Sequence, residues 1–177
     1  MLLPKMRQPF VIFDRDGTLI ELVPYLKDEK EIAFKPDIIE AFIKLKQKNF
    51  KFGIITNQSG IARGFFDKHK VEKINKIIVD YLKSFHIELS FIFYCPHHPS
   101  ENCKCRKPQI TLGEQAIREF NMDLDKTFMI GDQESDLQFG LALGMRVIQI
   151  KGKANKSPLA NHYSDTLMDA ANWILNQ

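Results

Sequence analysis

Short apolar runs alternate with amphipathic segments along the chain, and this alternation limits the fold more than any other feature of the sequence. Five runs have the length and the aromatic or β-branched content of buried strands: 10–13, 52–55, 91–94, 128–130 and 147–150. Apolar residues recur at helical spacing in five further segments: 37–48, 69–85, 112–120, 135–143 and 166–176. Such alternation predicts an α/β fold with three layers, a Rossmann-like arrangement in which helices cover both faces of a mainly parallel sheet.

The chain as a whole suits one compact unit. Its 177 residues contain no linker and no internal repeat, so we expect residues 1–177 to form a single domain. The net charge of +3 is too small to favour a nucleic-acid partner. The longest uncharged stretch, 89–100, is too short to cross a membrane, and charged residues near the N-terminus argue against a signal peptide. We expect a monomeric, cytoplasmic protein.

The first apolar run ends in a pair of acids, within the motif Asp14-Arg-Asp16-Gly17-Thr18. Side chains at positions i and i+2 of an extended chain project to the same side, which brings the carboxylates of Asp14 and Asp16 together. Gly17 lets the backbone turn sharply after them. On its own, such a motif indicates a turn or a cation-binding loop at least as readily as a catalytic pair.

Polar groups also follow the second, third and fourth runs. Thr56 opens a segment rich in hydrogen-bond donors, 57–60, whereas Lys107 comes after the third run and a loop. Asp132 and Asp136 follow the fourth run. Each has a structural alternative, namely a self-capped loop, a solvated lysine and a helix N-cap. However, the carboxyl ends of parallel strands meet at one edge of a sheet, so the four motifs are predicted to form one site.

An acid pair, a hydroxyl, a lysine and a final acid, in this order, resemble the four motifs of the haloacid dehalogenase superfamily of phosphohydrolases. The resemblance covers about residues 9–150 and rests on Asp14-Arg-Asp16-Gly-Thr18, Thr56, Lys107 and Gly131-Asp132…Asp136. It implies a phosphatase that hydrolyses phosphoric monoesters. The segment from Thr18 to Lys51 has room for one helix and loops, so we expect no inserted cap domain.

A phosphate monoester is anionic, and its negative charge must be neutralised before a nucleophile can attack it. Mg²⁺ suits this task because it prefers oxygen ligands. We expect it to bind the Asp14 carboxylate, the backbone carbonyl of Asp16 and the Asp132 carboxylate. The ammonium group of Lys107 and the hydroxyl of Thr56 are predicted to bind the remaining phosphoryl oxygens.

The two acids, Asp14 and Asp16, are predicted to have different catalytic roles. Asp14 is predicted to attack phosphorus and form an aspartyl-phosphate. Asp16 is predicted to protonate the leaving alcohol and then to deprotonate the hydrolytic water. Asp136 is expected either to support the water ligands of the metal or to orient Lys107, rather than to bind the metal directly.

All three cysteines lie in one loop, 95–105, together with two histidines. Isolated cysteines are usually small core residues, but two pairs spaced by one residue each project two ligands to one side. Three thiolates and one imidazole form a structural zinc set. The predicted ligands are Cys95, His97, Cys103 and Cys105. His98 is the competing imidazole, and the alternation from Cys95 disfavours it.

A zinc loop in this position resembles the cap-less phosphatases that act on D-glycero-D-manno-heptose 1,7-bisphosphate, which are relatives of histidinol-phosphate phosphatases. Segments 56–64 and 95–99 are similar to the heptose enzymes, and the short spacing between His98 and Cys103 is more similar to the histidinol enzymes. The resemblance implies a phosphorylated sugar as substrate and removal of its 7-phosphate. The implied substrate contacts are Tyr25, Asn57, Gln58, Ser59, Arg63, Arg106, Lys107 and Gln133.

Two departures from the heptose pattern bear on specificity. Leu22, Val23 and Pro24 stand where the family has polar residues, and Gln133 stands where it has a basic one. Histidinol phosphate therefore stays an alternative substrate. A signalling receiver domain is an alternative, because it also has acids, a hydroxyl and a lysine at its strand ends. Its aspartyl-phosphate persists because it has no base two residues after the nucleophile. Asp16 occupies that position here, so hydrolysis is expected rather than storage. A zinc-centred binding module is a further alternative, disfavoured by the absence of a basic or aromatic surface in the loop.

Overall fold

The computed structural model describes residues 7–26 and 28–177. The elements follow one another as β1 (Gln8–Phe13), η1 (Glu29–Glu31), α1 (Ile38–Lys46), β2 (Lys51–Asn57), α2 (Lys68–Ser84), β3 (Phe91–Cys95), η2 (Pro99–Glu101), α3 (Thr111–Phe120), β4 (Met122–Gly131), α4 (Glu134–Ala142), β5 (Arg146–Ile150), β6 (His162–Ser164) and α5 (Leu167–Leu175). Each of the five predicted strands and five predicted helices is present, which confirms the alternation of the sequence.

Six strands form one sheet in the order β3-β2-β1-β4-β5-β6, and all of their pairings are parallel. The predicted parallel α/β fold is therefore confirmed. The sequence did not indicate β6 or the first half of β4. β6 has only three residues and no apolar run, and it is a strand because it pairs with β5 through Ile148 and His162.

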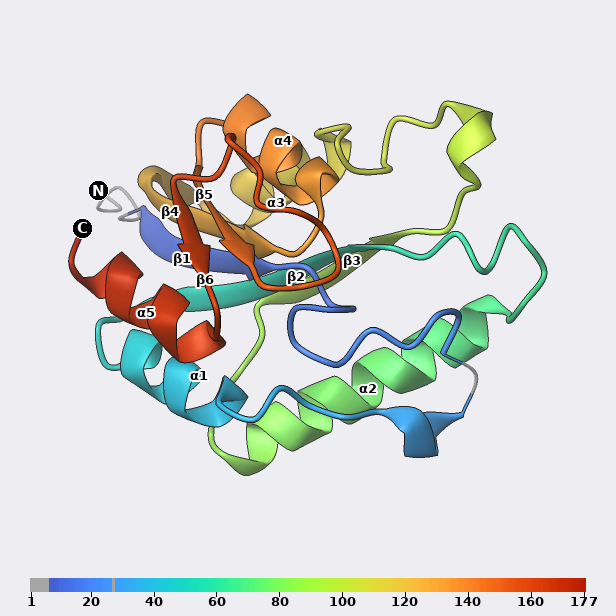
Figure 1. Ribbon diagram of the computed structural model, residues 1–177, viewed down its shortest axis with the longest axis horizontal. Coiled ribbons are helices and arrows are strands. Elements are labelled where there is room, and N and C mark those ends of the chain that lie inside the picture. Colours follow the sequence, from blue (N-terminus) through green and yellow to red (C-terminus); the bar gives the residue numbers. More distant parts are fainter. Residues whose placement is uncertain (1–6, 27) are drawn as a thin grey trace, which may run out of the picture.

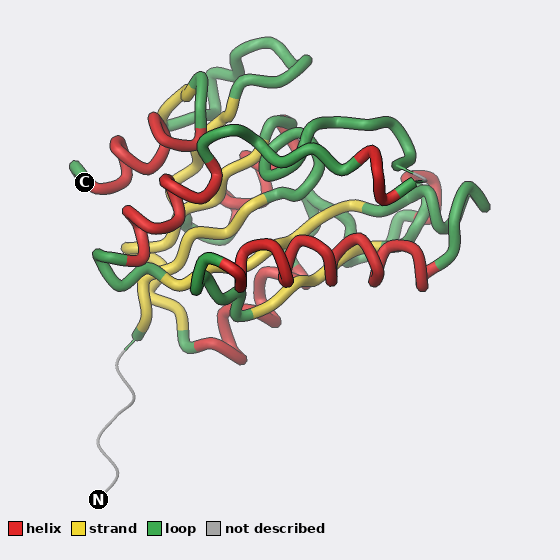
Figure 2. The backbone as a smooth tube through the Cα atoms, turned by 90° about the horizontal axis from the view of Figure 1, so that it is seen from below, coloured by secondary structure: helices red, strands yellow, loops and turns green. Residues whose placement is uncertain are grey.

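Two apolar cores lie on opposite faces of the sheet, because alternate residues of each strand point to opposite faces. In β1, Val11 and Phe13 pack with α1, α2 and α5, whereas Phe10 and Ile12 pack with α3 and α4. Figure 1 shows the latter two helices above the sheet and the other three below it. Seen from below in Figure 2, α1, α2 and α5 lie in front of the strands.

The strand order places the loops that carry the motifs at one edge. β1 is central, and the chain reverses direction across the sheet after β3 to place β4 on the other side of β1. Ligands of such sheets bind beyond the carboxyl ends of the strands at this switch point. The loops after β2 and β3 project from that edge, at the right of Figure 1. Between β1 and β2, the described residues form only η1, α1 and loops, with no inserted domain.

None of the helices in 7–26 and 28–177 combines the length and the apolar run that crossing a membrane requires.

Candidate active site

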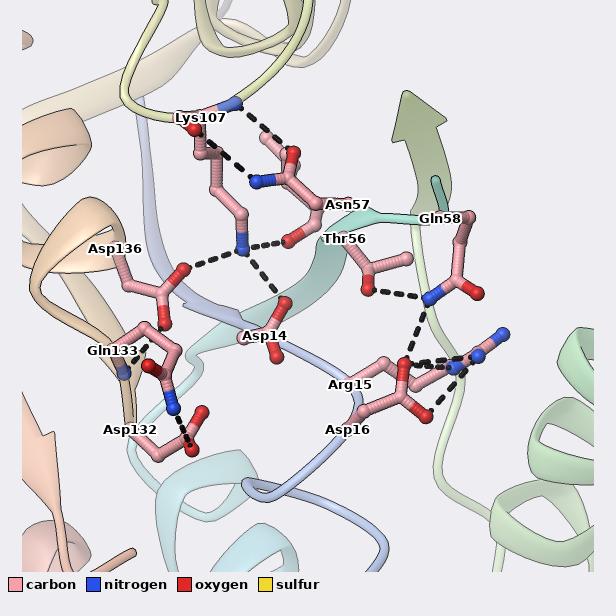
Figure 3. A network of polar contacts seen from close by, with 11 residues as sticks. Asp14, Arg15, Asp16, Thr56, Asn57, Gln58, Lys107, Asp132, Gln133 and Asp136 are labelled. Carbon is pink, nitrogen blue, oxygen red and sulfur yellow. Dashed lines mark hydrogen bonds and ion pairs between the residues drawn. The ribbon is translucent and has the colours of Figure 1, made fainter. Parts of the chain in front are cut away.

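Asp14 lies at the carboxyl end of β1, at the centre of the sheet edge. Its backbone N–H donates to the carbonyl of Ile130 at 2.9 Å, which ties the end of β1 to the neighbouring β4. The residue is 7% exposed, and its Oδ1 lies 2.7 Å from the ammonium nitrogen of Lys107 (Figure 3). The acid at this position is therefore buried, paired and held by the central strand.

Lys107 connects three strand ends. Its Nζ lies 2.7 Å from Oδ1 of both Asp14 and Asp136, and it donates to the carbonyl of Ile55 at 2.5 Å. Burial alone lowers the pKa of a lysine, but the two carboxylates outweigh this effect, so the pKa of Lys107 is raised. The side chain therefore stays cationic in the interior of the site.

The side-chain amide of Asn57 fixes the backbone of Lys107. Asn57 Nδ2 donates to the carbonyl of Lys107 at 3.1 Å, and its Oδ1 accepts from the Lys107 N–H at 3.0 Å. These two hydrogen bonds join the loop after β2 to the loop that carries Lys107. Sequence alone did not reveal this partner because 50 residues separate the two positions. Asn57 also lines both cavities of the site, and its predicted contact with substrate stays a prediction.

Asp132 follows β4 and faces Asp14 across the switch point. Gln133 Nε2 donates to its Oδ2 at 2.5 Å, whereas its buried Oδ1 has no hydrogen-bond partner among the described residues. Carboxylate oxygens of Asp14, Asp132 and Asp136 lie within 4.8 Å of one another. A hard divalent cation fits this set, because it would satisfy the unpaired oxygen and offset the gathered negative charge.

Burial dominates the titration of these acids. It raises the pKa of Asp14 to about 6 against the opposing charge of Lys107. Burial, followed by the charge of Asp14, also raises the pKa of Asp132 to about 6. The backbone at Gly17, which has φ 87°, passes close to Asp132, since a Cβ at that position would lie 2.7 Å from Asp132 Oδ2.

Asp136 is already engaged by other protein groups. Its Oδ1 accepts from Lys107, and its Oδ2 accepts from the backbone N–H of Gln133 at 3.1 Å, at the start of α4. Both oxygens therefore have partners within the protein. This arrangement is compatible with a role in orienting Lys107.

Asp16 points away from Asp14, toward a second group of polar residues (Figure 3). The guanidinium group of Arg15 donates to both of its oxygens at 3.1 Å. The amide nitrogen of Gln58 donates to Asp16 Oδ2 at 2.7 Å and to Thr56 Oγ1 at 3.0 Å. The donors of Gln58, which was expected to contact substrate, are thus directed at two other residues of the site.

Two adjoining cavities open at this edge. One, of about 700 Å³, is lined by the acids, Thr56, Lys107 and Arg106. One terminal nitrogen of the Arg106 guanidinium is buried and has no hydrogen-bond partner in 7–26 and 28–177. The other cavity, of about 300 Å³, has polar walls that include Asp16 and Ser59 and an apolar wall that includes Leu22–Leu26 and Phe66.

The remaining predicted substrate contacts divide between these cavities and the surface. Tyr25 lines both cavities, and its ring packs edge-on against Phe65 at a centroid distance of 4.3 Å. Gln133 lines the larger cavity. Arg63 is exposed on the loop after β2 and lines neither cavity, so its predicted contact with substrate stays a prediction.

The loop after β3 gathers the four residues predicted to bind zinc. The Sγ atoms of Cys95, Cys103 and Cys105 lie 3.0–3.7 Å apart, and His97 Nδ1 lies 3.1 Å from Cys105 Sγ. Tetrahedral zinc would set its sulfur ligands about 3.8 Å apart, so the donor set fits this ion. The imidazole of His98 instead contacts Ser100, with 2.7 Å between Nδ1 and Oγ.

Two polar residues of the site were missed by the sequence analysis. Arg15 lies between the two acids, and alternation suggests only that it points the other way. Asn75 lies in α2 and accepts from Arg15 Nη1 at 2.9 Å. Its position among the buried residues of that helix, which are Val71, Ile74, Asn75, Ile78 and Leu82, was a usable signal, since a polar residue in an apolar stripe needs a partner.

Comparison with known proteins identifies the family of this chain. The polynucleotide kinase 3 phosphatase family model matches residues 9–171. The chain belongs to this family of haloacid-dehalogenase-like phosphatases. It is 34% identical to the D-glycero-beta-D-manno-heptose-1,7-bisphosphate 7-phosphatase of Yersinia pestis, over 95% of this chain and 90% of that protein. It is 36% identical to the enzyme of the same name from Photorhabdus laumondii, over 82% of each chain.

A second set of relatives is longer. The chain is 39% identical over 144 residues to the bifunctional histidine biosynthesis protein HisB of Campylobacter jejuni, but it spans only 41% of that protein. Among solved structures, the D,D-heptose 1,7-bisphosphate phosphatase from B. bronchiseptica, complexed with magnesium and phosphate, has a TM-score of 0.85 and 26% identity. That similarity covers 96% of this chain and 99% of the solved chain. The phosphatase family and fold expected from the motifs are thus confirmed.

Proposed function

We propose that this phosphatase removes the 7-phosphate of D-glycero-D-manno-heptose 1,7-bisphosphate. Buried Lys107 between Asp14 and Asp136, beside the unpaired oxygen of Asp132, supports hydrolysis of a phosphate ester. Two relatives named D-glycero-beta-D-manno-heptose-1,7-bisphosphate 7-phosphatase, at 34% and 36% identity, support this substrate. Because the site groups described above all come from one chain, we also propose that the enzyme acts as a monomer.

The chain's own residues divide the reaction into two steps. The Asp14 carboxylate forms a bond to phosphorus as the bond to the ester oxygen breaks, and Asp16 gives its proton to that oxygen. Water then attacks the aspartyl-phosphate, Asp16 takes a proton from it, and the bond between Asp14 and phosphorus breaks. Lys107 and the Thr56 hydroxyl bind phosphoryl oxygens and stabilise the charge that builds up there.

Magnesium completes the proposed site. Asp14, Asp132 and the backbone carbonyl of Asp16 would hold the ion, which, when bound, neutralises charge on the phosphoryl group. Asp136 is left to orient Lys107, since both of its oxygens already have partners in the protein. The B. bronchiseptica relative, solved with magnesium and phosphate, supports this assignment.

Protons and Mg²⁺ should compete for these carboxylates. The ordinary pKa of Asp is 3.8, and those of Asp14 and Asp132 are raised to about 6 in the fold. Between these values the folded protein binds more protons than the unfolded one, so the metal-free protein loses stability as pH rises through this window. Mg²⁺ should therefore raise the Tm more at about pH 7.5 than at about pH 5. Thermal unfolding with and without Mg²⁺ checks this, and equal shifts would contradict it.

Zinc is proposed as a structural ion of the 95–105 loop. Purified protein should contain about one zinc per chain, held by three thiolates and His97. Cys103→Ser should lower the zinc content, as measured by elemental analysis, whereas the matched control His98→Ala should keep it because His98 faces Ser100. Losing zinc should loosen the approach to Lys107 before the sheet unfolds. Protein with no zinc, or loss of zinc in His98→Ala, would contradict the assignment.

The substrate is tested by comparing kcat/KM for heptose bisphosphate and histidinol phosphate. We expect the bisphosphate to be preferred, because Arg106 can bind its second phosphate, with Arg63 as a further candidate. Arg106→Ala should lower the ratio of kcat/KM for the bisphosphate to kcat/KM for histidinol phosphate. Gln133→Lys should raise this ratio by adding a cation. A preference of about tenfold for histidinol phosphate, or about 1.4 kcal/mol, would establish the alternative substrate. Steady phosphate release over many turnovers would also exclude the receiver-like mechanism.

A further inference from the structure

Arg15 is a buried cation, and Asp16 is its charged partner among the described residues. Its side chain is 2% exposed, and one terminal nitrogen lies 2.9 Å from Asp16 Oδ2. The same nitrogen, Nη2, also donates to Asp16 Oδ1 at 3.1 Å, and Nε donates to Asp16 Oδ2 at 3.1 Å. A guanidinium group that binds a carboxylate through two parallel donors fixes its orientation as well as its position. Arg15 therefore determines the direction in which Asp16 points.

Asn75 in turn fixes Arg15. Its Oδ1 accepts from Arg15 Nη1 at 2.9 Å, and the residue is 8% exposed in the middle of α2. The helix itself is anchored on the sheet through apolar residues on the same face, including Ile74 and Ile78. A contact from a packed helix to a buried guanidinium group gives Arg15 a rigid support, which a surface arginine would lack.

Gln58 holds Asp16 from the other side. Its Nε2 donates both to Asp16 Oδ2 and to the hydroxyl of Thr56, so it ties the acid to a residue predicted to bind phosphate. Figure 3 shows the contacts of the Gln58 amide and of the Arg15 guanidinium group converging on the Asp16 carboxylate. Hydrogen bonds from both Gln58 and Arg15 therefore orient the carboxylate, in addition to the loop after β1 that carries Asp16.

We infer that Arg15 and Asn75 are positioning residues for Asp16, and that through it they control protonation of the leaving group. The inference rests on the proposed role of Asp16 as acid and base. Asn75 lines neither cavity, and Arg15 borders the smaller one with a side chain that is 2% exposed and directed at Asp16, so the proposed role of both is to position Asp16. A displacement of about 1 Å at a reacting group can cost about a hundredfold in rate, so a loosened support should have a measurable effect.

Two substrates separate this role from a general loss of structure. An alkyl phosphate needs a proton on its ester oxygen as the bond to phosphorus breaks, whereas p-nitrophenolate leaves p-nitrophenyl phosphate without one. With the nitrophenyl ester, transfer of the phosphoryl group to Asp14 appears as a burst of nitrophenolate. The second step, in which Asp16 takes a proton from water, appears as the slower steady rate. Impaired positioning of Asp16 should therefore lower turnover of the alkyl ester and the steady rate with the nitrophenyl ester. It should leave the rate of the nitrophenolate burst unchanged.

The experiment measures kcat and KM for an alkyl sugar phosphate, together with the nitrophenolate burst, in Asn75→Ala. We expect kcat for the alkyl ester to fall about tenfold or more, with KM and the burst rate within about twofold of the parent enzyme. Arg15→Lys should show the same pattern, because an ammonium group cannot bind a carboxylate through two parallel donors. Asn161→Ala is the matched control, because the Asn161 amide oxygen accepts from the Val147 N–H at 2.7 Å, at the end of β5 away from the site. It should change neither the alkyl ester's kcat and KM nor the nitrophenolate burst rate.

Asp16→Asn provides the reference for both proposals. It should lower alkyl turnover while keeping the burst, and adding Asn75→Ala to it should cause no further loss. If Asp16→Asn slows the burst as much as alkyl turnover, the proposed chemistry of Asp16 fails and the inference fails with it. If Asp16→Asn behaves as expected but Asn75→Ala and Arg15→Lys slow the nitrophenolate burst as much as alkyl turnover, slow neither, or add to Asp16→Asn, the inference alone is overturned.

Discussion

Asp14→Asn should reduce kcat by at least about a thousandfold, because the substitution removes both the nucleophile and one proposed magnesium ligand. The loss should appear with every phosphate ester, including those with good leaving groups, since both steps pass through Asp14. No burst should remain with p-nitrophenyl phosphate. Steady-state and rapid-mixing assays measure these two quantities.

Stability distinguishes this loss from misfolding. Burial raises the pKa of Asp14 to about 6, so holding this carboxylate ionised at neutral pH costs free energy of folding in the metal-free protein. A neutral amide of the same size should therefore leave the Tm unchanged or raise it when no Mg²⁺ is present. Asp123→Asn, at the opposite end of β4, is the control and should retain activity. An active Asp14→Asn variant would remove Asp14 from the mechanism.

The arrangement of the acids could be predicted from sequence because strand order and strand ends are enough to place them. Asp14 and Asp132 directly follow buried apolar runs, and two parallel neighbouring strands bring such positions together. The cysteine loop could be predicted for a similar reason, since its ligands are close in sequence and alternate along the chain. Local patterns therefore located the groups whose neighbours are determined by backbone geometry.

The partners of the side-chain amides could not be predicted in this way. Asn57 and Gln58 lie in a segment rich in donors, and their amides donate to Lys107 and Asp16, contacts that no local pattern indicates. Such contacts depend on how loops from different strands approach one another. Arg15 is a further example, because its support comes from a helix that begins more than fifty residues later. Side-chain networks across long sequence separations were the part that only the structure revealed.

Lys107→Met should combine a large loss of activity with a large loss of stability. The substitution leaves the buried carboxylates of Asp14 and Asp136 without their cation, and breaking a buried ion pair in this way costs about 3–5 kcal/mol. The loss of a phosphate-binding charge should lower kcat/KM by about a hundredfold or more. Chemical denaturation measures the first effect and steady-state kinetics the second. Lys35→Met is the control, because it removes an ion pair to the half-exposed Glu21 and should cost at most about 1 kcal/mol.

A second substitution separates the two effects of Lys107→Met. Adding Asp136→Asn removes one of the two carboxylates left unpaired, so the double variant should recover part of the lost unfolding free energy. It should not recover activity, because no cation remains to bind the phosphoryl oxygens. Recovered activity would show that Lys107 serves only to compensate the acids. A destabilisation no larger than that of Lys35→Met would show instead that the buried acids are not held by this charge, and Asp136 would lose its proposed role in orienting Lys107.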